Sequence, residues 1–306
     1  MSRKRSRRDP AAETNAAPGV EPVGSAKVDA KASERRQTFR ELHRSGCFVI
    51  PNPWDAGSAR YLESLNFKAL ATTSSGFAWT LGRPDYGITR DMALTHFEQL
   101  CRSTTLPVNA DFQNGFARDE AALSENVLLA VATGIAGLSI EDSTGDELHP
   151  IYDLDVAIAR LKAARAAIDQ SGGETLLVGR AEGLLWGQPG IDEIEARLRA
   201  YSDAGADCLY APGVSKPDHI AQLVKAVAPK PLNLLVHASS PLTVSQIEAL
   251  GVRRVSVGGA LARVAWGAFT RAASMLAEQG SFEGFVDAAP GRAINAFFAD
   301  PPDSAG

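Results

Sequence analysis

The sequence is poor in cysteine and has no long apolar stretch. Its 306 residues include three cysteines, Cys47, Cys101 and Cys208, and none of these forms a CxxC pair. Because so few scattered cysteines exclude a disulfide framework, we expect a protein of the reducing cytoplasm. No apolar run approaches the roughly 20 residues that span a bilayer, so we expect no membrane partner. The net charge of -5 argues against a general nucleic-acid-binding role but permits anionic substrates.

The amino-terminal segment lacks the residues from which a core is built. Residues 1–8 are basic, but no apolar segment follows them, so they do not form a secretory signal. Residues 9–33 are rich in alanine, proline, glutamate and lysine. We therefore predict a disordered tail over residues 1–36. A cellular address or a nucleic-acid contact in the basic patch is the alternative.

From residue 37 onward, short apolar runs alternate with amphipathic helical patterns. Eight runs predict strands, at 47–50, 68–72, 106–110, 135–140, 175–179, 207–210, 232–236 and 252–257. Helical periodicity is clearest at 56–65, 154–168, 191–204, 217–227 and 243–250, and residues 282–298 predict one or two more helices. This alternation predicts an α/β fold, a (β/α)8 TIM barrel with extra carboxy-terminal helices, in a single domain over residues 37–300. A doubly wound open sheet is the alternative.

Acidic side chains follow three neighbouring predicted strands. Asp85 lies in the loop after the second strand, Asp111 follows the third, and Glu141 follows the fourth. The carboxyl ends of the strands form the active-site face of such a barrel, so these carboxylates are expected to converge. Converging carboxylates repel unless a cation neutralises them, and hard oxygen ligands suit Mg²⁺. The sequence therefore predicts a magnesium site, although Asp111 alone also fits a helix N-cap and Asp85 alone a turn.

Other strand ends predict a pocket for a small anionic substrate. Arg180, after the fifth strand, offers the two-pronged donor that a carboxylate or phosphonate needs, but an ion pair with Glu182 is an alternative role. Ser75 and Gly76 offer backbone N–H groups to an oxyanion. Asn233, on the seventh strand, is a further expected substrate contact.

Several motifs, one after each strand in order, resemble those of the phosphoenolpyruvate mutase/isocitrate lyase superfamily. The resemblance covers about residues 38–275, and its motifs are IPNPWDAGSA at 50–59, TSSG at 73–76, GRPD at 82–85, VNAD at 108–111, IED at 140–142, GRAE at 179–182, and AGAD at 204–207 followed by APG at 211–213. The resemblance implies a (β/α)8 barrel that binds Mg²⁺, acts on 2-oxo acids or phosphonopyruvate through a pyruvate enolate, and forms a homo-oligomer, a tetramer or a dimer.

Carried over residue by residue, the resemblance gives each position a role. It implies that Ser75 and Gly76 contact the oxo acid and that Arg180 binds an anionic group. It implies that Asp85, Asp111 and Glu141 hold the metal directly or through water. Trp54 and Asp55 would form the wall of the pocket at the first strand.

The sequence also departs from the family pattern at two places. Many members have two aspartates after the third strand, but here the first is Asn109. The loop after the fourth strand, residues 143–150, lacks the cysteine of the lyases and the lysine of the mutases. His149 is the only side chain of that loop that titrates near neutral pH, so it is a candidate acid/base.

We therefore expect a Mg²⁺-dependent carbon–carbon lyase or hydrolase of a small 2-oxo acid or related dicarboxylate. Arg180, Glu141 and His149 are its candidate catalytic residues, and the reaction would pass through an enolate. One alternative is a phosphonopyruvate-type mutase or hydrolase of a P–C bond. The other is a barrel that binds an anion without turning it over.

Overall fold

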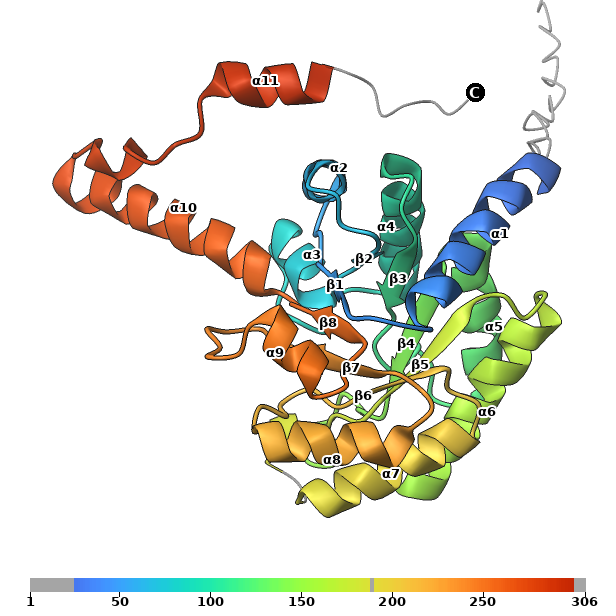
Figure 1. The fold of residues 1–306 in the computed structure, drawn as a ribbon. Helices are drawn as coiled ribbons and strands as arrows, with labels where there is room; N and C mark the ends of the chain where they lie inside the picture. Colours follow the sequence, from blue (N-terminus) through green and yellow to red (C-terminus); the bar gives the residue numbers. More distant parts are fainter. Residues whose placement is uncertain (1–24, 188–189, 300–306) are drawn as a thin grey trace, which may run out of the picture.

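The computed structural model describes residues 25–187 and 190–299. Eight parallel strands pair in the order β1-β8-β7-β6-β5-β4-β3-β2, and a hydrogen bond from Ala71 N to Pro51 O brings the second strand against the first (Figure 1). The strands are β1 Phe48–Ile50, β2 Leu70–Ala71, β3 Val108–Asp111, β4 Gly137–Glu141, β5 Leu176–Arg180, β6 Cys208–Tyr210, β7 Leu232–Leu235 and β8 Arg254–Ser256. The predicted (β/α)8 barrel is confirmed, and the open-sheet alternative is wrong.

Helices on the outside connect these strands. They are α2 Ala56–Ser64, α3 Ser74–Thr80, α4 Arg90–Ser103, α5 Glu120–Ala132, α6 Leu154–Gln170, η1 Gly183–Trp186, α7 Ile191–Asp203, α8 Pro217–Val227 and α9 Val244–Ala249. The apolar stripes that predicted helices at 154–168, 191–204 and 217–227 face the barrel, with Leu161, Leu198 and Leu223 fully or almost fully buried. The main core therefore lies between the strands and their helices. None of the described helices has the length and apolarity needed to cross a membrane.

An amino-terminal helix, α1 (Ser25–Leu42), packs near the amino ends of the strands. Phe39 is fully buried there, and its ring meets those of His43 and Phe48 edge-on. The Arg36 guanidinium donates to the backbone oxygens of Val131 and Ile135. The segment 25–36, which we predicted as the end of a disordered tail, is therefore helical and anchored. Residues 1–24, which include the basic patch, lie outside the described residues.

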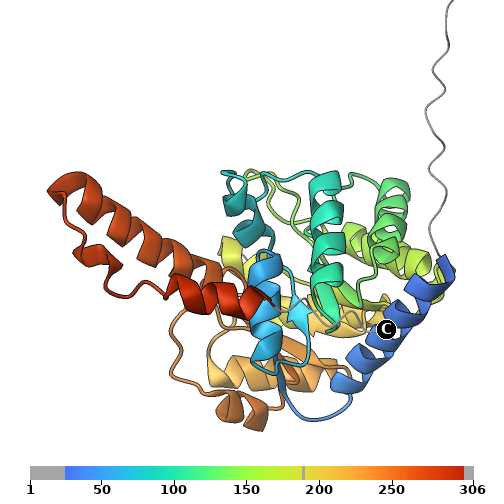
Figure 2. The same ribbon diagram turned by 90° about the horizontal axis from the view of Figure 1, so that it is seen from above.

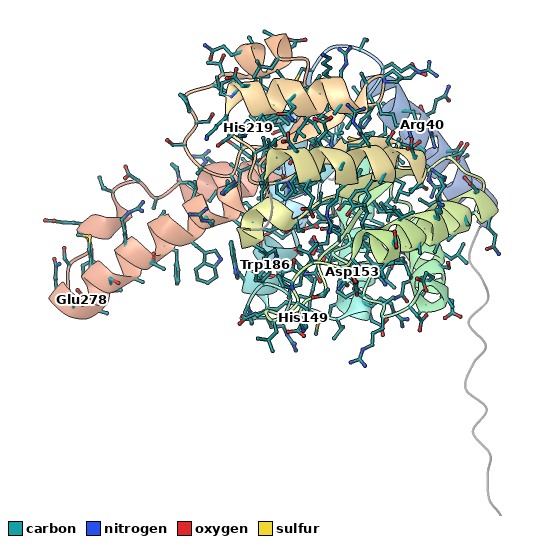
Figure 3. The ribbon with its side chains drawn as sticks, turned by 90° about the horizontal axis from the view of Figure 1, so that it is seen from below. Arg40, His149, Asp153, Trp186, His219 and Glu278 are labelled. Carbon is teal, nitrogen blue, oxygen red and sulfur yellow. The ribbon has the colours of Figure 1, made fainter. Side chains whose placement is uncertain are left out.

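Helix α10 (Ala260–Gln279) follows β8, and the extra helices predicted at 282–298 correspond to a short helical turn and one further helix. The long helix α10 starts beside β8 and extends away from the barrel, so that Glu278 lies at its far end (Figures 2 and 3). A short turn, η2 (Glu283–Phe285), packs back on α10, and α11 (Gly291–Ala299) returns to α2. There the rings of Phe297 and Tyr61 lie 5.4 Å apart. Ala262 is the only buried residue of α10, so most of this helix is uncovered in one chain.

Candidate active site

A cavity of about 350 Å³ opens at the carboxyl ends of the strands. Its volume is at the low end of the roughly 300–1,000 Å³ typical of small-molecule sites. Five of the residues predicted from the sequence line it: Ser75, Asp85, Asp111, Arg180 and Asn233. Because these residues come from four strands or the loops after them, the fold itself brings them together, as the strand-end argument predicted.

Asp111, the last residue of β3, is fixed by its neighbours. Its backbone N–H donates to Thr72 Oγ1 at 2.8 Å, and its Oδ2 accepts from the backbone N–H of Ser74 at 3.0 Å. Asp111 is therefore not the N-cap of a following helix, which was the alternative role. Because the second loop donates to the Asp111 carboxylate, the carboxylate is held at the mouth of the barrel.

Arg180, the last residue of β5, is the cation that contacts the acids at the mouth of the site. Its Nη1 donates to Asp111 Oδ1 at 3.1 Å, its Nε donates to Glu182 Oε1, and Nε lies 3.4 Å from Glu141 Oε2. Its guanidinium carbon also lies 5.0 Å from the centre of the Tyr210 ring. The ion pair with Glu182 exists, yet Arg180 lines the cavity as well. Arg180 thus both neutralises the acids around it and faces the space where a substrate would lie.

Glu141, the last residue of β4, is buried behind the cavity rather than lining it. The Tyr86 hydroxyl donates to Glu141 Oε1 at 2.6 Å. Burial is the main reason that the pKa of Glu141 rises to about 8, and Arg180 opposes this rise. Tyr86 itself adopts a left-handed backbone conformation with φ of 60°. Glu141 is therefore a partner of Arg180 and Tyr86 in this structure, one step removed from the cavity.

Asp142 supports the same strand ends from the outer side. Its carboxylate accepts from the backbone N–H of Glu182 at 2.7 Å, from the Tyr201 hydroxyl at 2.5 Å and from Arg197 Nη1 at 3.2 Å. Glu141 and Asp142 are both 3% exposed, so neither is a solvated loop acid. This buried cluster ties the start of the loop after β5 to β4, and so it restricts where Glu182 and Arg180 can lie.

Three predicted substrate contacts have other roles. Asp55 is the N-cap of α2 and accepts from Ser58 N at 2.7 Å. Gly76 donates its N–H to Thr73 Oγ1, so this group is not free for an oxyanion. Trp54 does not line the cavity, and its Cβ would lie 3.2 Å from a Cβ added at Gly76. Trp54 and Asp55 therefore act in local packing and capping, whereas Ser74 and Ser75 provide the polar surface of the second loop.

His149 is exposed and does not line the cavity. Its loop is closed by a bond from Thr144 Oγ1 to the His149 backbone oxygen at 2.5 Å, and Figure 3 shows His149 toward the edge of the barrel. The imidazole that lines the cavity belongs to His237, which follows β7. The sequence analysis selected His149 from its loop and did not select His237.

Asp85 and Asp111 are the carboxylates that a metal would meet in the cavity. The pKa of Asp85 is raised because its carboxyl is desolvated and because Asp111 lies nearby, whereas Arg180 lowers it. Within the described residues, however, no three His, Cys, Asp or Glu side chains are arranged closely enough to hold a metal ion. Two carboxylates with water and substrate oxygens match the way proteins hold Mg²⁺, which usually takes only one or two of them. The predicted third ligand, Glu141, is turned toward Tyr86.

Sequence reasoning missed several side chains in the lining. Tyr210, at the end of β6, is buried, and burial raises its pKa to about 12, so its hydroxyl stays protonated. Asn52 links the segments after β2 and β8, since its Nδ2 donates to the Thr72 backbone oxygen and its Oδ1 accepts from the backbone N–H groups of Val257 and Gly258. Arg254, on β8, lines the floor. The sequence did contain one signal for Arg254, because it is a charged residue within a predicted strand that should be buried.

Comparison with known proteins agrees with this fold. The phosphoenolpyruvate phosphomutase family matches residues 39–277. The chain belongs to the phosphoenolpyruvate mutase/isocitrate lyase superfamily. The superfamily contains lyases and mutases, so an enzymatic role is supported for this member.

Three relatives illustrate the range of the superfamily. A protein of Burkholderia cenocepacia J2315 named only as a lyase/mutase has a TM-score of 0.85 and 45% identity, over 89% of this chain and 98% of that one. Oxaloacetate acetylhydrolase in complex with oxalate has a TM-score of 0.77 and 26% identity, over 87% and 94% of the two chains. Oxaloacetate decarboxylase of Ectopseudomonas mendocina (strain ymp) is 30% identical over 237 residues, 74% of this chain and 79% of that protein.

Proposed function

We propose that the protein is a Mg²⁺-dependent lyase or hydrolase that cleaves a C–C bond of a small 2-oxo acid. The observation that carries the proposal is the convergence of Asp85, Asp111 and Arg180 on one cavity at the strand ends. Two of the relatives described above are named for activity on oxaloacetate, which supports this substrate class.

The residues of the cavity have separate tasks in such a reaction. When the bond between the carbon beside the oxo group and the next carbon breaks, its electron pair moves toward the oxo oxygen and leaves an enolate, and the departing carbon leaves as CO2 or a carbonyl group. Arg180 would bind a carboxylate of the substrate and stabilise the developing charge, because it is buried, preformed and anchored by Asp111 and Glu182. The Tyr210 hydroxyl, which stays protonated, lines the same space and can donate a hydrogen bond.

Asp85 and Asp111 would hold the magnesium ion. The ion would polarise the oxo group of a bound substrate. The fit rests on two carboxylates that line one cavity and are close enough for Asp111 to raise the pKa of Asp85. The proton needed at the carbon would come from water or from His237, since His149 lies outside the cavity.

The test is turnover of an oxo-acid and phosphonate panel with and without Mg²⁺. We expect turnover of oxaloacetate or an alkylmalate-like acid, loss of activity in excess chelator, and at least about a hundredfold loss in Asp111→Asn. Asp91→Asn is the matched control, because Asp91 is an exposed acid on α4. Full activity in excess chelator would refute the magnesium requirement. Turnover of phosphonopyruvate alone, seen by phosphorus NMR, would instead favour P–C chemistry.

We also propose that the chain forms a homo-oligomer through its carboxy-terminal helices. Val264, Phe269, Phe282 and Val286 are between 61% and 84% exposed in one chain. Apolar side chains gathered on a projecting element mark an interaction surface. A second copy of this chain would bury them, and light scattering after size exclusion measures the resulting mass.

A further inference from the structure

Arg254 is a buried cation on the floor of the cavity. It is the first residue of β8 and is 3% exposed. Its Nε donates to Asn233 Oδ1 at 2.8 Å, and its Nη1 lies 3.4 Å from Asn109 Oδ1 and from His43 Nε2. Among the described residues, no carboxylate forms a salt bridge with Arg254, whereas Arg180 has three such partners.

The groups around Arg254 are neutral. His43 Nδ1 lies 2.7 Å from the backbone oxygen of Phe39, which fixes the proton on Nδ1 and leaves Nε2 as an acceptor. Burial, with a smaller effect of Arg254, lowers the pKa of His43 to about 3. Asn233 is held in turn by its Nδ2 bond to Ser256 Oγ at 2.9 Å. The positive charge of Arg254 is therefore solvated by polar groups but not balanced.

A buried charge without a counter-charge is costly, and proteins normally pair it. Nε and Nη1 of Arg254 face its protein neighbours, and Nη2 makes no hydrogen bond to any residue in the described ranges. Arg254 also lies two residues before the carboxyl end of β8, whereas Arg180 is the last residue of β5. Two strand residues span about 6.6 Å, so the two guanidinium-bearing residues start at different depths of one cavity.

We propose that Arg254 binds a second anionic group of the substrate, the carboxylate at the end distant from the oxo group. This inference rests on the proposed function and narrows its substrate class to oxo diacids. A small oxo acid would present one end to Arg180 and the metal site at the mouth and the other end to Arg254 on the floor. Asn233 and Asn109 are positioning residues, because they hold the Arg254 side chain rather than the substrate.

The test compares two probes that share a four-carbon difluoro oxo-acid skeleton, 3,3-difluorooxaloacetate and 3,3-difluoro-2-oxobutyrate. The oxo group has the same CF2 neighbour in both, and they differ in that the first ends in a carboxylate and the second in a methyl group. With Mg²⁺ present, calorimetry should show that the unaltered protein binds the diacid at least tenfold more tightly. Arg254→Gln should weaken diacid binding about thirtyfold or more, as expected for one partner of a buried charge pair, and change binding of the monoacid less than about twofold.

Two further variants separate recognition from folding. Arg253→Gln is the matched control, because the neighbouring Arg253 reaches the exposed Gly46 backbone oxygen on the outside of the barrel. It should bind both probes as the unaltered protein does. Asn233→Asp keeps the shape of the floor and gives Arg254 an internal counter-charge, so it should remove the preference for the diacid while the protein stays folded.

The outcomes distinguish this inference from the proposed function. If a folded Arg254→Gln variant loses affinity for both probes equally, or loses affinity for neither, the proposed role of Arg254 is wrong. An unchanged diacid preference in Asn233→Asp would overturn it as well. If the unaltered protein binds neither probe and turns over no oxo acid, the proposed function itself is wrong.

Discussion

Replacing Arg180 should destabilise the protein in a way that depends on pH. Arg180→Gln leaves Asp111, Glu141 and Glu182 without the cation that contacts all three. Removal of one partner of a buried ion pair costs about 3–5 kcal/mol, and Arg180 and its two glutamates are largely buried. In a domain of this size, that loss lowers the melting temperature by roughly 6–20 °C.

The sign of the pH dependence follows from the glutamates. Burial raises the pKa of Glu141 and of Glu182 above the model-compound value of 4.5, and Arg180 opposes the rise in both cases. An acid whose pKa is higher in the folded state binds more protons when folded, so stability falls as pH rises from 4.5 through the folded pKa. Without Arg180, the folded-state pKa values of these glutamates rise further. The folded protein therefore continues to lose stability up to a higher pH.

The assay is urea unfolding of both proteins at pH 5.5, 7 and 8.5. The difference in the free energy of unfolding between the unaltered protein and Arg180→Gln should grow most between pH 7 and 8.5. It opens there because Glu141, with a folded pKa of about 8, ionises in the unaltered protein but stays protonated in the variant. Arg263→Gln, which removes an exposed arginine from the same cavity, should cost less than about 0.5 kcal/mol at every pH. A difference for Arg180→Gln that is constant, or that shrinks toward pH 8.5, would refute the view that Arg180 restrains the pKa values of these glutamates.

Three further predictions concern packing, the loop after β2 and assembly. A Cβ at Gly137 would lie 2.8 Å from a buried phenylalanine ring, so Gly137→Ala should cost about 1–3 kcal/mol in urea unfolding, whereas Gly291→Ala, with no heavy atom of a described residue within 4 Å of the added Cβ, should cost almost nothing. Tyr86→Phe removes the hydrogen bond to Glu141 and should lower the free energy of unfolding by about 1 kcal/mol; an unchanged value would mean that the bond contributes nothing. Phe269→Asp should convert the oligomer to a smaller species by light scattering, and an unaltered mass would place the interface elsewhere.

Much of the fold could be predicted because hydrophobic periodicity reports burial directly. The strand runs and the helices at 154–168, 191–204 and 217–227 have buried faces that repeat at the expected spacing. Helix α1 was missed because its sequence is dominated by charged residues and alanine, which are also typical of disordered tails. Its place depends on distant partners, such as the backbone oxygens that accept from Arg36 and Arg40, and no local pattern shows these.

The site could be predicted only in part, for a related reason. The ends of parallel strands meet, so Asp111 and Arg180 could be placed from their positions alone. The hydrogen-bond partner of each group depends on how that group is oriented. Glu141 accepts from the Tyr86 hydroxyl, and the Gly76 N–H donates to Thr73. Contacts across the barrel join residues that are far apart in the sequence. No pattern in the neighbouring residues shows which of them will pack together.

Asn109 shows how the structure changes the meaning of a sequence difference. The sequence suggested that an asparagine here, in place of the usual aspartate, removes a charge from the metal site. In the structure, its Oδ1 lies 3.4 Å from Arg254 Nη1, on the floor of the cavity. The neutral residue thus leaves Arg254 unbalanced rather than weakening the carboxylates at the mouth.

Asn109→Asp separates these two interpretations. If residue 109 faces Arg254, the new carboxylate pairs with a buried cation, and the ligand-free protein should gain about 1 kcal/mol in urea unfolding while its Mg²⁺ affinity stays the same. The gain should also be absent in the Arg254→Gln background, because the partner is then missing. If residue 109 faces the metal instead, Mg²⁺ binding by calorimetry should tighten, and the ligand-free protein should lose stability through repulsion from Asp111. A tighter Mg²⁺ affinity without the gain in stability would therefore contradict the arrangement of the cavity floor described here.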